Sequence, residues 1–245
     1  MEPLKPSIAT MRTLTRNSKP HGFTLIELIA VIAVMAVLFG LVAPSVSDTI
    51  QASTLTTVGD NILNEIVAAQ QIAVSENRVI DVRFLRFTDP DSTLATTAIV
   101  RALLITGTED NPAGSAGAPI VKVIRPPIRF PSPIVAADGA GISTLTDAAE
   151  PNIGTGTSTS GSDVDPSADP PNLFSESSYS YTYLRFYPDG STGLPIKSGT
   201  APLTDTWHLT LVNEVDTVVT GGALPSNFYT IVLDAVTGRA TRFRP

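Results

Sequence analysis

The longest apolar stretch of the chain lies near its beginning. Residues 23–43 read FTLIELIAVIAVMAVLFGLVA, in which Glu27 is the one charged side chain. At a rise of about 1.5 Å per residue, a helix of this length spans roughly the 30 Å hydrocarbon core of a bilayer. The pattern therefore predicts a transmembrane helix over residues 23–43.

Two other interpretations of this stretch stay open. A buried core helix of a soluble protein would normally have a polar face, which residues 23–43 lack. A secretory signal peptide has a shorter apolar region followed by a small-residue cleavage site, for which Ala43, Pro44 and Ser45 are the candidates. The length of the stretch and the presence of Glu27 favour the transmembrane helix over both.

The apolar pattern changes after Pro44 from continuous to periodic. Apolar side chains at three- and four-residue spacing predict one buried helical face: Val58, Ile62, Ile66, Ala69 and Ala73. We therefore expect an amphipathic continuation of the helix over residues 44–78, with its last turn near Asn77. Intrinsic helix propensity is lowest between Gly40 and Gly59, where the helix should be weakest.

Residues 79–87 begin a series of short strand patterns. Ile80, Val82 and Phe84 fall on one face of this segment and Asp81, Arg83 and Leu85 on the other, as in a half-buried strand. Further strands are predicted at 98–106, 120–125, 179–187, 207–212, 229–234 and 240–243, with a turn at 236–238 before the last and another at Asp189-Gly190. The simplest topology is an antiparallel meander. The fold class is therefore α+β, with a globular β domain over residues 79–245.

A polar tract interrupts the strand patterns. Residues 150–172 contain almost no apolar side chain, which predicts a flexible loop over about 138–176. Asp163, Asp165 and Asp169 lie close together there. Calcium requires six to eight oxygen ligands in a defined geometry, and the tract lacks the spacing of a calcium-binding loop. We therefore predict no metal site and no cofactor.

Composition excludes most catalytic chemistry. The 245 residues include no cysteine, which excludes disulfides, thiolate nucleophiles and cysteine-based zinc sites. Of two histidines, His208 lies between Trp207 and Leu209 in a strand pattern, which favours a structural role over that of a general base. No serine-nucleophile or nucleotide-binding motif accompanies it. We therefore expect a protein that is not an enzyme.

Charge is distributed unevenly along the chain. Residues 1–22 carry four basic side chains against Glu2, a net charge of +3, which leaves −10 for the rest of a chain of net charge −7. After Lys19 the next basic residue is Arg78. The positive-inside rule then places the N-terminus in the cytoplasm and the β domain across the membrane. The acidic domain also argues against nucleic acid as a partner.

The segment HGFTLIELIAVIAVMAVLFGLVAP resembles the N-terminus of type IV pilins and type II secretion pseudopilins. The resemblance implies that prepilin peptidase cleaves a basic leader, residues 1–22, after Gly22 and that Phe23 is then N-methylated. Glu27 falls at the fifth mature position, where the family keeps a glutamate, and Pro44 at the twenty-second, where many members have a helix-kinking proline. The implied fold is the pilin lollipop, a long N-terminal helix whose first half crosses the membrane and whose second half packs on an antiparallel sheet or sandwich.

A carboxylate and a new amine in an apolar environment each need a counter-charge. Cleavage after Gly22 would create that amine on Phe23, about one helical turn from Glu27. In a stack of subunits, the amine of one chain can meet Glu27 of its neighbour, which would make Glu27 an assembly residue. The alternative is a carboxylate that extends to the lipid headgroups without a partner.

Further segments resemble more specific groups of proteins. AAQQIAVSENRVIDVRF, LRFYPDGSTG and YTIVLDAVTGRATRF are similar to the H-type minor pseudopilins. ENRVIDVRF, RFYPDGST, WHLTLV and NFYTIVLDAVTGRATRFRP are more similar to the Verru_Chthon cassette D proteins, a pilin-like family. These resemblances cover about residues 1–106 and 179–245, so residues 107–178 have no counterpart in them.

Together these features predict a minor pseudopilin or minor pilin. The resemblance implies a bacterial inner-membrane precursor with a single transmembrane helix and a periplasmic domain, which then joins a filament of a type II secretion or type IV pilus-like system. Its partners would be prepilin peptidase and other pilin-like subunits. The alternative is a membrane-anchored extracytoplasmic β domain that binds a partner without assembling.

Overall fold

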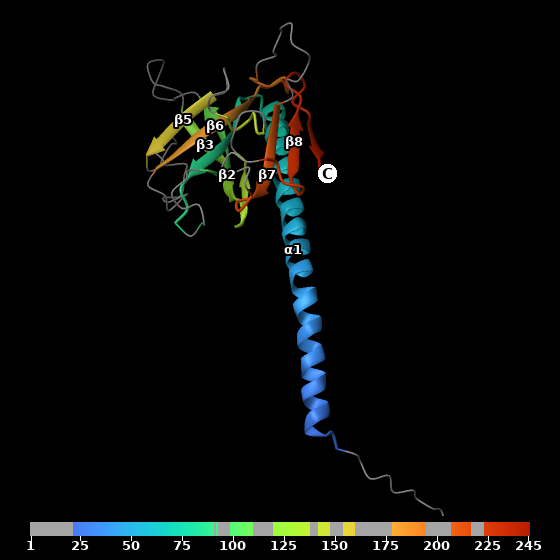
Figure 1. The fold of residues 1–245 in the computed structure, drawn as a ribbon. Coiled ribbons are helices and arrows are strands. Elements are labelled where there is room, and N and C mark those ends of the chain that lie inside the picture. The colour runs from blue at the N-terminus through green and yellow to red at the C-terminus, as the bar shows by residue number, and fades with distance from the viewer. Residues whose placement is uncertain are drawn as a thin grey trace, which may run out of the picture. The chain divides into compact units, whose positions relative to one another are not determined.

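The computed structural model describes residues 22–90, 92, 99–109, 120–137, 142–147, 154–159, 178–194, 207–216 and 223–245. These residues form one helix, α1 (Leu25–Ser75), and nine strands (Figure 1). The strands are β1 (Ile80–Phe87), β2 (Ile99–Glu109), β3 (Ile120–Arg129), β4 (Ile134–Ala136), β5 (Gly154–Thr159), β6 (Ser178–Phe186), β7 (Trp207–Asn213), β8 (Tyr229–Leu233) and β9 (Ala240–Phe243). The chain divides within α1 into two compact units, residues 1–47 and residues 48–245.

All paired strands of the second unit are antiparallel, in the order β5-β6-β1-β2-β4-β7-β8-β9, and β3 pairs with β2 beside β4. The seven predicted strands are confirmed. The predicted meander is wrong as a description of the whole sheet, because β6 returns to pair with β1. A salt bridge also links these two strands, since the Arg185 guanidinium donates two hydrogen bonds to the Asp81 carboxylate at 2.7 and 2.9 Å.

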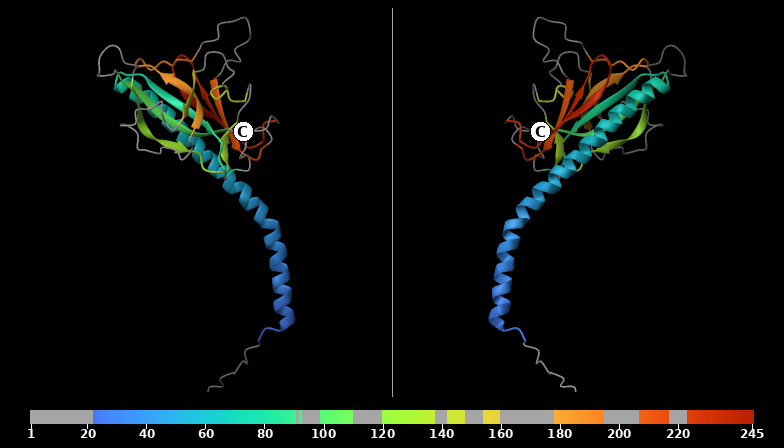
Figure 2. Two further views of the ribbon diagram at one scale, coloured as in Figure 1. Left: turned by 90° about the vertical axis from the view of Figure 1, so that its left-hand side faces the viewer. Right: turned by 90° about the vertical axis from the view of Figure 1, so that its right-hand side faces the viewer.

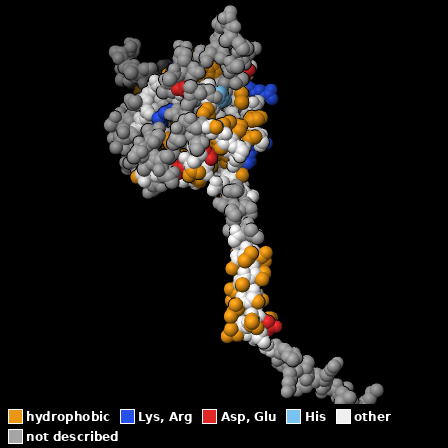
Figure 3. Space-filling view, viewed as in Figure 1, with side chains coloured by type: hydrophobic (Ala, Val, Ile, Leu, Met, Phe, Trp, Pro, Cys, Tyr) orange, Lys and Arg blue, Asp and Glu red, His pale blue; other side chains and the backbone are white. Residues whose placement is uncertain are grey.

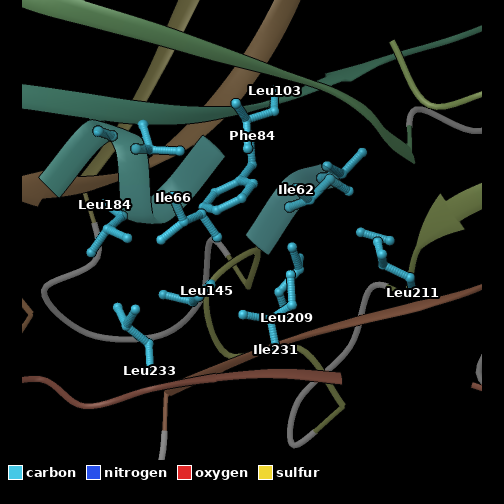
Figure 4. Close-up of a cluster of buried hydrophobic side chains, with 14 of the residues drawn as sticks. Ile62, Ile66, Phe84, Leu103, Leu145, Leu184, Leu209, Leu211, Ile231 and Leu233 are labelled. Carbon is cyan, nitrogen blue, oxygen red and sulfur yellow. The ribbon is translucent and has the colours of Figure 1, made fainter. Parts of the chain in front are cut away.

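The second half of α1 packs against one face of this sheet (Figure 2). The five apolar side chains predicted to form its buried face, Val58, Ile62, Ile66, Ala69 and Ala73, are all buried. Figure 4 shows Ile62 and Ile66 beside Phe84, with side chains of β7 and β8 completing the cluster. Apolar side chains recur about every 3.6 residues on the helix and every second residue on the strands, so that each element has one apolar face. These faces pack together into one continuous core.

The opposite face of β1 is covered as well. The prediction of a half-buried strand is wrong, because Asp81, Arg83 and Leu85 are at most 6% exposed. Leu85 belongs to a second apolar cluster with Phe87, Ala102, Leu104 and Tyr179. Arg83 stacks its guanidinium over the Tyr181 ring, 4.5 Å from the centroid. A long apolar stem under a charged head lets arginine occupy such a face.

Two strands were not predicted. β4 has three residues and follows two prolines, so it has too little pattern to detect. β5 lies inside the predicted flexible loop, which is therefore wrong for residues 154–159; the parts of that loop outside the described ranges stay a prediction. In β5, Gly154 and Gly156 lie opposite Tyr183 and Tyr181 of β6, whose rings occupy the space that a Cβ would need. Aromatic rings of the neighbouring strand thus replace the missing side chains.

Asp60 of α1 connects the helix to the last two strands. Its Oδ1 accepts hydrogen bonds from the Tyr229 hydroxyl and from Nη1 of Arg242, both at 2.6 Å. These two bonds lower the pKa of Asp60, while burial and the neighbouring carboxylate raise the pKa of Tyr229 to about 12. Next to Asp60, Gly59 lies directly under the Tyr229 ring. The glycine therefore allows a close approach of β8 to the helix.

Two turns of the sheet are attached to α1 through Gln70. Its Nε2 donates to the carbonyl oxygens of Gly190, at 2.8 Å, and Thr237, at 2.7 Å. Gly190 and Gly238 adopt positive φ values of 82° and 67°, which glycine allows without strain. The predicted turns at 189–190 and 236–238 are thus confirmed, and a single amide joins both to the helix.

The boundary between the two units generates a first prediction. A chain shortened to residues 47–245 should be soluble, monomeric and β-rich, because it lacks the apolar stretch but keeps the buried helical face with its sheet. Size-exclusion chromatography, circular dichroism and thermal unfolding test this. Insoluble protein, or loss of the cooperative unfolding transition, would contradict a self-sufficient second unit.

Gly59→Ala should destabilise the protein, although alanine favours helix by up to about 1 kcal/mol over glycine. The new Cβ would lie 2.5 Å from Tyr229 ring atoms, and such overpacking costs about 1–3 kcal/mol. We expect the free energy of unfolding to fall by about 1–2 kcal/mol in urea titrations. Asn64→Ala, at an exposed position of the same helix, is the control and should be neutral or stabilising. Equal effects of both variants would show that helix propensity alone governs position 59.

Candidate functional site

Thr24 and Glu27 form a reciprocal cap at the beginning of α1. The Glu27 Oε2 atom accepts hydrogen bonds from the Thr24 backbone N–H and from the Thr24 hydroxyl, both at 2.8 Å. The Glu27 N–H in turn donates to Thr24 Oγ1 at 3.3 Å. This is the capping box, in which the residue before the helix and the third helical residue satisfy each other's backbone donors. A carboxylate in the first turn also interacts favourably with the helix dipole.

The cap leaves part of the carboxylate available. Both contacts with Thr24 fall on Oε2, and Oε1 has no hydrogen-bond partner among the described residues. Cleavage after Gly22 would place the new amine on Phe23, directly before the capping threonine. Glu27 can therefore keep its own helix capped while Oε1 accepts a hydrogen bond from another group.

The described helical residues that follow expose apolar side chains on all sides. The large apolar residues from Phe23 to Phe39 are 49–82% exposed, and Figure 3 shows them as a hydrophobic surface with one acidic group at its beginning. A contiguous apolar surface of this size normally marks a contact with protein or lipid. The polar cap is thus located at the edge of a surface built for apolar contacts.

Gly22 lies before the helix, in a segment without regular secondary structure. A Cβ at this position would have no atom within 4 Å, and the residue has no positive φ. The fold of the described residues therefore gives no reason for glycine here. A peptidase that reads the residue before the cut would give one.

Two further predictions concern this region. Within the described residues, no helix is both long and apolar enough to cross a membrane, so the predicted transmembrane segment at 23–43 is not confirmed. Pro44 lies inside α1. The side chains of residues 41–48 lie outside the described part of the chain, and the kink at Pro44 stays a prediction.

The other candidate residues are His208 and the three aspartates of the polar tract. His208 is half-buried in β7, with Nδ1 3.4 Å from the Thr144 hydroxyl, and its backbone N–H donates to the same hydroxyl at 2.8 Å. The described residues contain no group of three or more histidine and acidic side chains able to hold a metal ion. Asp163, Asp165 and Asp169 lie outside the described ranges.

Thr24 is the site residue that the sequence analysis missed. A signal for it was present, because Thr-x-x-Glu directly before an apolar run is the sequence signature of a capping box. From the sequence, Glu27 was expected to pair with the amine of another subunit or to extend to the lipid headgroups without a partner. The structure adds a partner within the same helix.

Comparison with known proteins agrees with the assignment of this region. Residues 17–43 match the family model of the prokaryotic N-terminal methylation motif. The match contains Gly22, Phe23, Thr24 and Glu27, and supports a pilin-like substrate of prepilin peptidase. Comparison with curated proteins and with solved structures gives no match.

Processing can be tested at Gly22. If the Gly22–Phe23 bond is cut, N-terminal mass analysis of membrane-extracted protein should give a chain that begins with methylated Phe23. Gly22→Val should block cleavage without altering the fold, because a Cβ there contacts nothing. Unchanged thermal unfolding of the variant is the control. A mature chain that begins at Ser45 or Val46 would instead identify a signal peptide.

Proposed function

We propose that this chain is a pilin-like structural subunit, a minor pseudopilin or minor pilin. It is made as an inner-membrane precursor with a cytoplasmic N-terminus, cut by prepilin peptidase after Gly22 and methylated on Phe23. Its helix then enters a filament of a type II secretion or type IV pilus-like system, with the β domain on the periplasmic side.

The observation that carries this proposal is the Thr24–Glu27 cap at the edge of the exposed apolar helix. The cap holds the Glu27 carboxylate in a fixed position beside the exposed apolar side chains. A helix that served only as a membrane anchor would need apolar side chains alone. The methylation motif covers the same residues. A fixed position for the Glu27 carboxylate favours pairing with a charge on another chain.

Charge neutralisation gives the cap a role in assembly. Oε2 is held by Thr24 of the same chain, and Oε1 is available to the methylated Phe23 amine of a neighbouring subunit. In an apolar surrounding, an ammonium without a counter-charge is strongly disfavoured. The pair therefore favours one axial offset between subunits over others.

Two substitutions separate the charge of Glu27 from its capping role. Glu27→Gln removes the charge but keeps a side chain that can cap, since glutamine also serves in capping boxes. Thr24→Ala removes the hydroxyl of the cap, at a cost of about 1 kcal/mol, and keeps the charge. We expect both variants to be cleaved and retained in membranes, because neither makes the helix less apolar.

Incorporation into filaments should distinguish the two variants. Removing one partner of a buried ion pair costs roughly 3–5 kcal/mol, so Glu27→Gln should lower the incorporated fraction by at least about 100-fold. Thr24→Ala should lower it by less than about tenfold. Immunoblotting of sheared filaments measures both. If Glu27→Gln were incorporated as efficiently as the wild-type protein, the proposed role of the charge would be refuted. If the wild-type protein itself were absent from filaments, a membrane-anchored binding domain would be favoured.

A further inference from the structure

A small polar cavity lies where the end of β6 meets β5, at one edge of the sheet (Figure 1). Its volume is about 120 Å³, and the described residues that line it are Gly154, Tyr183, Arg185, Tyr187, Gly193 and Leu194. Side chains at every second position of an extended chain point to the same face. The two tyrosines and the arginine between them therefore reach the cavity together, and a glycine lies on either side of them.

The two glycines shape the cavity. A Cβ at Gly154 would lie 2.1 Å from Cζ of Tyr183, so the phenol group of this tyrosine occupies the place of the missing side chain. A Cβ at Gly193 would lie 3.5 Å from the Tyr187 hydroxyl and 3.2 Å from Cβ of Arg185. Gly193 has no positive φ, so its backbone conformation does not require glycine. A side chain at position 193 would therefore narrow the cavity beside the Tyr187 hydroxyl.

Three polar groups of the cavity have no hydrogen-bond partner among the described residues. They are the hydroxyls of Tyr183 and Tyr187 and the Nη1 group of Arg185. Nε and Nη2 of Arg185 donate to Asp81, so both N–H groups of Nη1 are left over. Polar groups inside a fold are normally paired. Three convergent donors and acceptors without a partner therefore indicate a place for a polar ligand.

The cavity carries no net charge. Arg185 is the one charged residue among the described residues that line it, and the buried Asp81 carboxylate neutralises its guanidinium. The guanidinium also lies over the Tyr183 ring, with Cζ 5.1 Å from the centroid. An anionic ligand would meet the Asp81 carboxylate behind the same guanidinium, so the arrangement favours a neutral ligand. The contacts with Asp81 and Tyr183 hold Nη1 in a fixed position for it.

We propose that this cavity binds a neutral saccharide, with one sugar ring inside it. Sugar hydroxyls both donate and accept hydrogen bonds, as the two phenol hydroxyls do, and the N–H groups of Nη1 can bind the oxygens of neighbouring hydroxyls. The C–H face of a sugar ring is apolar and packs on a tyrosine ring. The volume of about 120 Å³ is well below the roughly 300 Å³ of sites for drug-sized ligands. A single ring therefore enters, and the rest of the saccharide stays outside.

Saturation-transfer difference NMR on the full-length chain tests the proposal. The protein is kept in a zwitterionic detergent without a sugar headgroup, so that the detergent does not compete for the cavity. The neutral probes are methyl glucoside, maltose, cellobiose, lactose and chitobiose, and glucuronate is the acidic one. A ligand of about a dozen non-hydrogen atoms that binds with ordinary efficiency has a Kd of about 1 mM. We expect at least one neutral probe to bind with a Kd of this order.

Four substitutions locate the bound sugar. Tyr183→Phe and Tyr187→Phe each remove one hydroxyl and keep the ring, and each should raise the Kd about three- to tenfold. Tyr181→Phe is the matched control, because Tyr181 lies on the same strand opposite Gly156 and outside the cavity; its Kd should equal that of the wild-type protein. Gly193→Ala narrows the cavity and should raise the Kd at least about tenfold. Thermal unfolding checks that each variant is folded.

Three results would overturn the proposal. The same Kd for the variants at 181, 183 and 187 would show that the sugar binds elsewhere. Tighter binding of glucuronate than of methyl glucoside, weakened by added salt, would identify an anion site instead. No signal from any neutral probe up to about 20 mM would leave water as the occupant. None of these measurements involves filaments, so a failure of sugar binding would leave the proposed role in assembly intact.

Discussion

The whole second unit depends on burial of one helical stripe. Residues 58–73 of α1 present an apolar face, and the sheet covers this face. Within the sheet, β6 lies on one side of β1, and β7, β8 and β9 lie toward the other edge. Without this helix the inner sides of Phe84, Leu209 and Ile231 would face water. Burial of each such side chain contributes about 1.5–3 kcal/mol. Helix and sheet therefore fold as one body, and the chain that precedes them is free to carry a different function.

Local periodicity explains what could be predicted from the sequence. The stripe on α1 and seven of the nine strands in the described ranges depend on the order of neighbouring residues, and both appear in the structure. What could not be predicted depends on partners far away in the chain. β5 has no apolar alternation of its own and exists because tyrosines of β6 fill its glycine positions. The pairing of β6 with β1 likewise joins segments far apart in the chain, as Asp81 and Arg185, 104 residues apart, show.

The hydrophobic and polar pattern of the sequence also did not predict buried charged side chains. Arg101 of β2 and Glu214 after β7 form a 2.8 Å ion pair in which both side chains are 4% exposed, and Ser92 hydrogen-bonds to both. Position in a strand pattern would assign Arg101 to solvent. For the candidate site the situation was the reverse. Glu27 was identified because it is out of place in an apolar run, whereas Thr24, an ordinary polar residue at a helix start, was overlooked.

The attachments of the sheet to α1 have a mechanical consequence. Asp60 holds the β8 and β9 strands, and Gln70 holds the two glycine turns, ten residues further along the helix. A helix pulled along its axis would load these two attachment points together, in shear, with the interlocked apolar stripe between them. Bonds loaded in parallel must break together, so the domain resists sliding along its helix far better than it resists being peeled from one end. A subunit that transmits tension along its helix would thus keep its domain in register.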